Sequence, residues 1–72
     1  MARRRTFSGS KLRARRRAAG LSLRTLGRKL DTEYTSISKW ENGHRSPKPP
    51  TLLLLVDMLG CEVSDLFEAV NE

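Results

Sequence analysis

The chain has 72 residues, of which 31% are charged and 38% are hydrophobic, a balance typical of one small globular domain. All fourteen Lys and Arg residues lie in positions 1–48 beside three acidic residues, whereas positions 49–72 contain five acidic residues and no Lys or Arg. This asymmetry indicates a polyanionic partner for the first two-thirds of the chain, either nucleic acid or an anionic membrane. The longest apolar run, Leu52–Val56, is too short to span a bilayer, and the single cysteine, Cys61, with a single histidine provides neither a disulfide nor a zinc site.

Residues 1–9 are predicted to form a flexible basic arm, ahead of a folded domain at residues 10–70. The arm contains three consecutive arginines, Arg3, Arg4 and Arg5. Unanchored chain ends are commonly disordered, and a basic arm can follow the DNA backbone or enter a minor groove. A solubilising tail is the alternative that the sequence leaves open.

Five short helices are predicted to follow, because apolar side chains recur at helical spacing between capping and stop residues. No segment alternates polar and apolar side chains convincingly, so no strand is expected and the fold class is all-α. The predicted helices are 10–19 with Ser10 as N-cap, 22–30 with Ser22 as N-cap, 33–42, 49–59 entered through Pro49-Pro50, and 64–70 with Ser64 as N-cap.

Helices 22–30 and 33–42, with the turn between them, have the spacing of a helix-turn-helix. From Gly20-Leu21-Ser22 through Ile37-Ser38-Lys39-Trp40-Glu41-Asn42-Gly43, the sequence resembles the Cro and phage-repressor family, also called the XRE or lambda-repressor-like family. The resemblance covers about residues 10–68. It implies a five-helix DNA-binding domain whose third helix enters the major groove, in a transcriptional repressor that binds a palindromic operator as a homodimer.

Four positions depart from the family pattern. Leu23 stands where the family often has a phosphate-contacting Gln, and Gly27 stands where Ala is usual. Asp31 occupies a turn position often held by Gly, which it suits because Asp tolerates the left-handed conformation better than most residues. Glu33 replaces the usual Ser or Thr cap, so Thr32 is expected to cap the third helix instead.

The contacts to double-stranded DNA are expected from the outward face of helix 33–42 and from both of its flanks. Lys39 can donate to guanine O6 and N7, and Thr35 can offer a methyl or a hydroxyl group. By position in the family's motif, the resemblance implies base contacts from Tyr34, Thr35 and Lys39, with Ser38 as a further candidate. Phosphate contacts are predicted at the N-terminus of helix 22–30 and after helix 33–42, from Ser22, Arg24, Thr25, Asn42, Gly43, His44, Arg45 and Lys48.

Two further groups of residues are given other roles. Arg16 and Glu41 project toward the apolar stripes of their helices, where an unpaired charge is very costly. The corresponding family positions form an ion pair, so we expect this pair to fix the recognition helix. Leu53, Leu54 and Met58 lie off the main apolar stripe of helix 49–59 and are predicted to contact another protein, a second copy included, through the last two helices. Incidental exposure is the alternative.

An enzyme is not expected, because no Ser/His, Cys/His or paired-carboxylate constellation occurs, and neither is a cofactor or a metal. The sequence leaves two alternatives to a repressor. One is the DNA-binding antitoxin of a toxin–antitoxin pair, and the other is a protein-interaction adaptor without specific DNA readout. The expected location is the cytoplasm of a bacterial or phage-infected cell.

Overall fold

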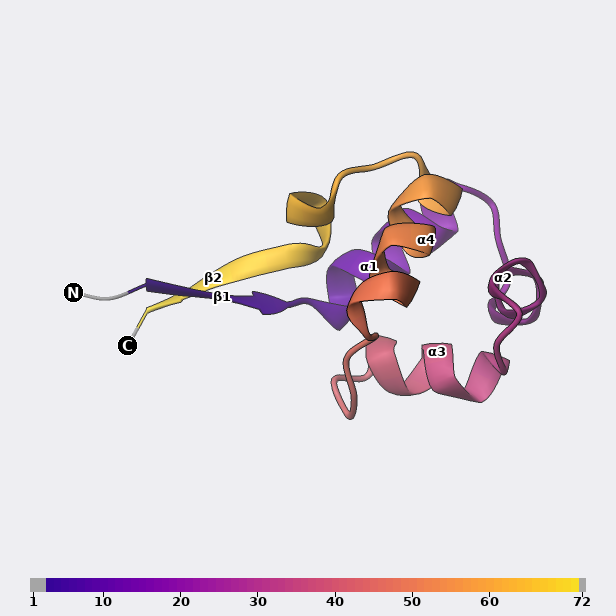
Figure 1. Cartoon of the computed structure of the whole chain (residues 1–72), viewed down its shortest axis with the longest axis horizontal. Helices are drawn as coiled ribbons and strands as arrows, with labels where there is room; N and C mark the ends of the chain where they lie inside the picture. The colour runs from indigo at the N-terminus through magenta and orange to yellow at the C-terminus, as the bar shows by residue number, and fades with distance from the viewer. Residues whose placement is uncertain (1–2, 72) are drawn as a thin grey trace.

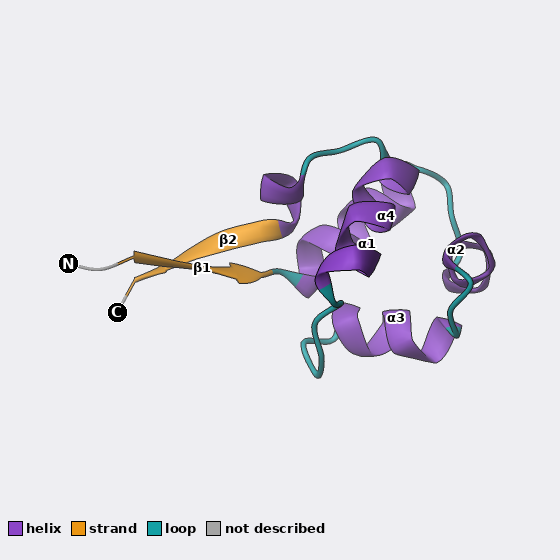
Figure 2. Cartoon of the chain, in the orientation of Figure 1, coloured by secondary structure: helices purple, strands orange, loops and turns teal. Residues whose placement is uncertain are grey.

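The computed structural model describes the backbone of residues 3–71 and the side chains of residues 5–70. In this part of the chain, four α-helices form a bundle and two strands form a ribbon that projects from it (Figures 1 and 2). None of these helices has the length and apolar composition that crossing a lipid bilayer requires. In chain order the elements are β1 (Arg3–Phe7), α1 (Gly9–Ala18), α2 (Leu23–Leu30), α3 (Tyr34–Glu41), α4 (Pro49–Leu59), a 3-10 turn (Val63–Leu66) and β2 (Phe67–Asn71).

The four α-helices lie where the sequence predicts them, and most of their ends follow local rules. The Ser22 hydroxyl caps α2 by accepting from the Thr25 backbone N–H at 3.0 Å. Asp31 ends α2 in the left-handed conformation, with φ at 53°. The expected cap of α3 by Thr32 is wrong, because Glu33 is the N-cap and its side chain makes no capping hydrogen bond. The start of α3 therefore relies on packing against α2.

Helix α1 begins at Gly9, and its N-cap lies two residues before the predicted Ser10. Ser8 is the N-cap, and its hydroxyl accepts from the Lys11 backbone N–H at 3.3 Å. Gly9 follows, and a Cβ atom there would collide with the backbone carbonyl oxygens of Trp40 and Glu41. The first turn of α1 thus lies directly on the end of α3, which only glycine permits.

The core is formed by leucines, an isoleucine and a tryptophan from every helical segment. Its buried members are Leu12, Leu26, Leu30, Ile37, Trp40, Leu55, Leu59 and Leu66. Gly27 allows α2 to approach the start of α3, since a Cβ would lie 2.7 Å from the Thr32 carbonyl oxygen. Cys61 packs at the edge of this core, and burial raises the pKa of its thiol, so it stays protonated at neutral pH.

The two ends of the described chain form a ribbon, which corrects two predictions. Residues 1–9 were expected to be a flexible arm and residues 64–70 a helix, but β1 pairs antiparallel with β2 from Phe7–Phe67 to Arg3–Asn71. The two phenylalanine rings meet edge to face with centroids 5.9 Å apart. The helix predicted at residues 64–70 is replaced by the 3-10 turn and β2, because Phe67 pairs with Phe7 of β1. The ribbon gives the molecule its long dimension of 41 Å, against 23 and 21 Å (Figure 1).

Candidate nucleic-acid interface

Helix α3 lies along one side of the bundle, with α2 beyond its first turn and the loop of residues 42–48 beyond its last (Figure 1). Its inner side chains, Ile37 and Trp40, are buried in the core. Tyr34, Thr35 and Lys39 are exposed on the outer side, where the sequence predicts base contacts. The fold therefore presents one face of α3 to solvent and holds the other rigidly.

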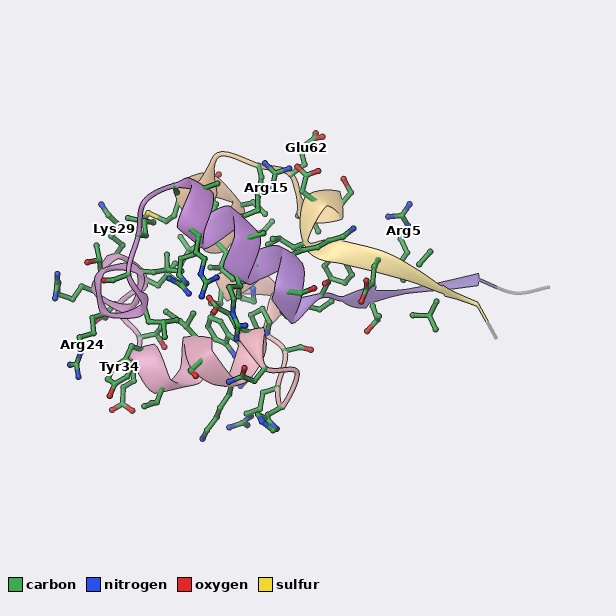
Figure 3. All side chains as sticks on the ribbon, turned by 180° about the vertical axis from the view of Figure 1, so that it is seen from behind. Arg5, Arg15, Arg24, Lys29, Tyr34 and Glu62 are labelled. Atoms are coloured by element: carbon green, nitrogen blue, oxygen red, sulfur yellow. The ribbon has the colours of Figure 1, made fainter. Side chains whose placement is uncertain are left out.

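Tyr34 and Arg24 form a unit at the end of the interface formed by α2 and α3 (Figure 3). The Arg24 guanidinium carbon lies 4.3 Å from the centroid of the Tyr34 ring, a cation–π contact. An Arg24 Nη2 atom also donates to the Tyr34 hydroxyl at 3.4 Å. One face of the ring is thus covered by arginine, which orients the phenol.

Glu33 is not among the residues predicted for the interface, yet it lies beside the predicted contacts. The Thr35 hydroxyl donates to a Glu33 carboxylate oxygen at 3.5 Å. A carboxylate can accept from the amino group of cytosine, so Glu33 adds an acceptor to a face otherwise rich in donors. A surface hollow of about 430 Å³ joins these groups, lined by Arg24, Arg28, Thr32, Glu33, Tyr34 and Thr35. The missing Ser or Thr cap at Glu33 is the sequence signal that could have pointed to it.

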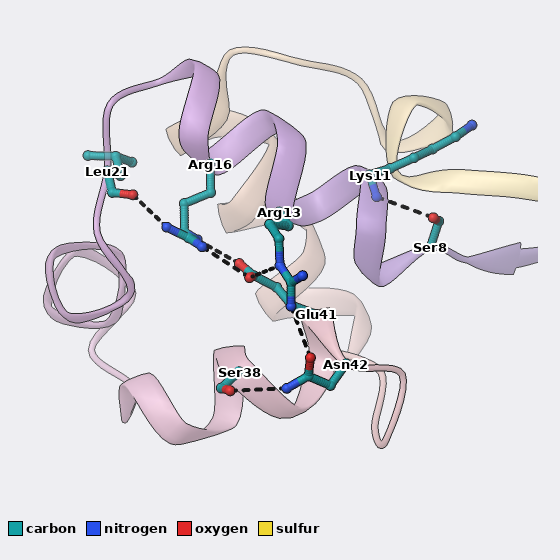
Figure 4. Close-up of polar contacts among 8 residues, drawn as sticks. All are labelled: Ser8, Lys11, Arg13, Arg16, Leu21, Ser38, Glu41 and Asn42. Atoms are coloured by element: carbon teal, nitrogen blue, oxygen red, sulfur yellow. Dashed lines mark hydrogen bonds and ion pairs between the residues drawn. The ribbon is translucent and has the colours of Figure 1, made fainter.

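Ser38 and Asn42 are partly engaged within the protein (Figure 4). The Asn42 amide nitrogen donates to the Ser38 hydroxyl at 3.3 Å, and an Arg13 guanidinium nitrogen donates to the Asn42 amide oxygen at 2.9 Å. The second N–H of the Asn42 amide nitrogen has no hydrogen-bond partner among the described residues. Arg13 is not among the predicted site residues, so this link between α1 and α3 was not predicted.

The predicted phosphate contacts lie at the two flanks of α3. On one side, Ser22 and Thr25 stand at the N-terminus of α2, with their hydroxyl groups 2.9 Å apart. On the other side, the loop after α3 is held by the Lys39 carbonyl oxygen, which accepts from the backbone N–H groups of His44 and Arg45 at 2.9 and 3.4 Å. Gly43, His44, Arg45 and Lys48 are all exposed.

Arg16 and Glu41 pair with each other beneath this interface, as the sequence predicts (Figure 4). Arg16 Nε and Nη2 donate to the two Glu41 carboxylate oxygens at 2.6 and 3.1 Å, and Arg16 Nη1 donates to the Leu21 carbonyl oxygen at 2.9 Å. The Glu41 hydrogen bond holds the pKa of Arg16 above its ordinary value. Arg13 Nε reaches the same carboxylate at 3.2 Å. Two arginines of α1 therefore fix the last turn of α3.

The other predicted site residues lie away from α3. The side chains of Arg3 and Arg4 lie outside the described part of the structure, and the exposed Arg5 extends from the ribbon, far from Arg24 and Tyr34 (Figure 3). On α4, the residues Leu53, Leu54 and Met58 are 59%, 46% and 40% exposed. Their position permits contact with another protein, and that role stays a prediction.

The comparisons agree with this geometry. Residues 12–66 match the family described as Helix-turn-helix. No curated protein sequence matches the chain. Among solved structures, the P22 c2 repressor bound to synthetic operator 9T is 30% identical with a TM-score of 0.78, over 85% of this chain and 92% of that one.

Two further structures are similar at the same level. The DNA-binding domain of the P22 c2 repressor in solution is 30% identical with a TM-score of 0.77, over 85% of this chain and 80% of that one. The restriction-modification controller protein C.AhdI from Aeromonas hydrophila is 32% identical with a TM-score of 0.75, over 82% and 89%. The matched residues contain most of α1 and all of α2 to α4, with the α2–turn–α3 unit, and the chain belongs to the helix-turn-helix family of the Cro and phage-repressor type.

Proposed function

We propose that this protein is a sequence-specific double-stranded DNA-binding regulator of transcription, most simply a repressor that binds a palindromic operator as two copies. The observation that carries the proposal is the exposed outer face of α3, which presents both hydrogen-bond donors and acceptors and has the predicted phosphate contacts at both of its ends. The operator complex of the similar P22 c2 repressor supports it. Such a protein would act in the cytoplasm.

Within this proposal, Lys39 and Thr35 read base edges from the last and the first turn of α3. Tyr34 and Arg24 act together, because the arginine covers one face of the ring. The tyrosine is then left with its hydroxyl and its other face for a phosphate or a thymine methyl. Glu33 selects against bases that offer only acceptors at its position.

The phosphate contacts would lie on the two DNA strands that border the major groove. At one flank are the free N–H groups of the first turn of α2, whose helix dipole favours an anion. At the other are Arg45 and Lys48 of the exposed loop. Arg3–Arg5 would add a third point of contact from β1, now as an ordered strand instead of a flexible arm.

Selection of binding sites from random duplexes tests the proposal. We expect enrichment of a two-fold symmetric site whose half-sites lie about one helical turn apart. The selected site should bind at least 10³-fold more tightly than scrambled duplex, the low end for specific regulators at physiological salt. Equal affinity for all duplexes would contradict sequence-specific regulation and favour a protein-interaction adaptor.

A further inference from the structure

Arg13, Asn42 and Ser38 form a chain of hydrogen bonds at the edge of the candidate interface (Figure 4). Arg13 Nε donates to Glu41 Oε1 at 3.2 Å, and Arg13 Nη2 donates to Asn42 Oδ1 at 2.9 Å. The Glu41 side chain is 2% exposed and is also held by Arg16, so the Arg13 guanidinium is anchored on a rigid group. Arg13 therefore presents an N–H donor to Asn42 at a fixed place.

The orientation of the Asn42 amide follows from this contact. A guanidinium group has five N–H donors and no acceptor, so only the amide oxygen of Asn42 can face Arg13. The amide nitrogen then lies on the other side, where it donates to the Ser38 hydroxyl oxygen at 3.3 Å. Arg13 thus decides which end of the Asn42 side chain reaches Ser38.

The direction of this chain sets the role that is left to the Ser38 hydroxyl. Its oxygen accepts from Asn42, so its proton points away from that bond, and no other hydrogen bond of this hydroxyl is found among the described residues. Ser38 is partly exposed on α3. A donor that is covered without an acceptor costs free energy, so DNA that covers α3 binds best when it offers an acceptor at this point.

We propose that Arg13 is a positioning residue that fixes Ser38 as a hydrogen-bond donor, so that Ser38 selects a keto base over an amino base in the major groove. Guanine O6 and thymine O4 are acceptors there, whereas adenine N6 and cytosine N4 are donors. The inference rests on the proposed function, because it names the class of base that one residue of the same interface reads.

Asn42→Asp reverses the direction of the chain. The introduced carboxylate still accepts from Arg13, but it has no proton to donate, so the Ser38 hydroxyl must donate to it. Ser38 then presents only lone pairs to DNA, which suit the amino groups of adenine and cytosine. Ser46→Asp, in the exposed loop after α3, is the matched control for the added negative charge.

Competition binding on duplexes that carry each of the four bases in turn along the selected half-site measures the effect. The position that loses its preference in Ser38→Ala identifies the base that Ser38 faces. At that position, we expect the parent protein to favour guanine or thymine about tenfold over adenine or cytosine, and Asn42→Asp to lose or reverse this preference. Ser46→Asp should weaken binding to all duplexes alike and keep the preference.

Substitutions of Arg13 separate positioning from structural support. Arg13→Met removes the donor, so the Asn42 amide can turn over, and the base preference should fall to about twofold or less. Arg13→Lys still offers donors and no acceptor, and it should restore the preference. Arg17→Met, exposed on the same helix, loses the same charge and should keep it. A lower Tm of Arg13→Met with equally weakened binding to every duplex would show structural support alone and overturn the proposal.

The amide orientation is tested without DNA, from the side-chain NH2 signals of Asn42 in nitrogen-15 NMR spectra. Ser38→Ala should shift the signal of the proton that faces Ser38 much more than that of the other, and Arg13→Met should move both toward the values of an exposed asparagine. Unchanged signals in both variants would overturn the orientation.

The two proposals fail in different ways. Selective DNA binding with the same base preference in Asn42→Asp as in the parent would overturn the role of Arg13 and Ser38 alone. Equal affinity of the parent protein for every duplex would overturn the proposed function and the base readout with it, and the NMR signals would then decide the amide orientation by themselves.

Discussion

Lys39 is exposed in the last turn of α3, and among the described residues no hydrogen bond of its side-chain amino group is found. If it donates to a guanine, Lys39→Ala should weaken operator binding by about 1–3 kcal/mol and relax selectivity at one base position. Lys29→Ala, in the exposed last turn of α2, is the matched control and should change affinity little. Competition binding with single-base variants of the selected site measures both effects. Equal weakening on operator and random duplex would assign Lys39 to a phosphate.

The Arg16–Glu41 pair should matter for stability through the cost of leaving Glu41 without its closest partner. Arg16→Ala is expected to lower the free energy of unfolding by about 3 kcal/mol, with the contact of Arg13 limiting the loss. Urea denaturation measures the change. Replacing both residues by apolar ones, as in Arg16→Met with Glu41→Leu, should restore much of it, because no buried charge then remains. Unfolding of the single variant at the parent midpoint would show that the ion pair contributes nothing.

Residue patterns could show that Arg16 and Glu41 each interrupt an apolar stripe, and the family resemblance implied that they pair. The resemblance also placed Asp31 at a turn position, whose left-handed conformation Asp accepts. The Arg13–Asn42–Ser38 chain and the Arg24–Tyr34 stack could not be predicted the same way. Each depends on how the helices are placed against one another, and a single exposed arginine in a sequence carries no mark of its partner.

Among the elements, the contact between α1 and α3 depends on Gly9. A side chain there would collide with two carbonyl oxygens at the end of α3, so Gly9→Ala should force the helices apart and destabilise the fold by about 2 kcal/mol or more, within the range for overpacking. Gly20→Ala is the control. It adds a Cβ in open space at φ of 71° and should cost only about 1–2 kcal/mol of backbone strain. Thermal denaturation of both variants makes the comparison, and an equal effect would show that α1 can shift freely.

Local sequence signals predict the helices but not the ribbon. The four α-helices were predictable because caps, stops and apolar spacing all lie within each segment. The ribbon was not, because its two strands are at opposite ends of the chain and neither has a convincing alternating pattern. Phe7 and Phe67 lie in strands because they pair with each other across the ribbon. Gly9 was assigned to the arm because the residues that it contacts, at the end of α3, are about thirty positions away in the sequence.

At the scale of the whole molecule, the basic residues of the first two-thirds should set the salt dependence of DNA binding. Each phosphate neutralised contributes about −0.9 to the slope of log K against log salt concentration. If Arg3–Arg5 contact phosphates, replacing all three with Gln should flatten the slope by about two to three units. Operator affinity over a salt series gives the slope. Substitution by Gln keeps the strand, whereas deletion of the three residues would also remove their pairing with β2. An unchanged slope would show that these arginines do not contact phosphates and would favour a solubilising role.

The ribbon also has a consequence for the order of folding. It joins residues roughly 60 positions apart, so forming it early would close nearly the whole chain into a loop, at a high cost in entropy. The helix-turn-helix unit needs only local contacts and should form first. Phe7→Ala should therefore speed unfolding in stopped-flow experiments and leave the refolding rate nearly unchanged, the behaviour of a contact absent from the transition state. The ribbon is then the part of the native protein that opens first and closes last.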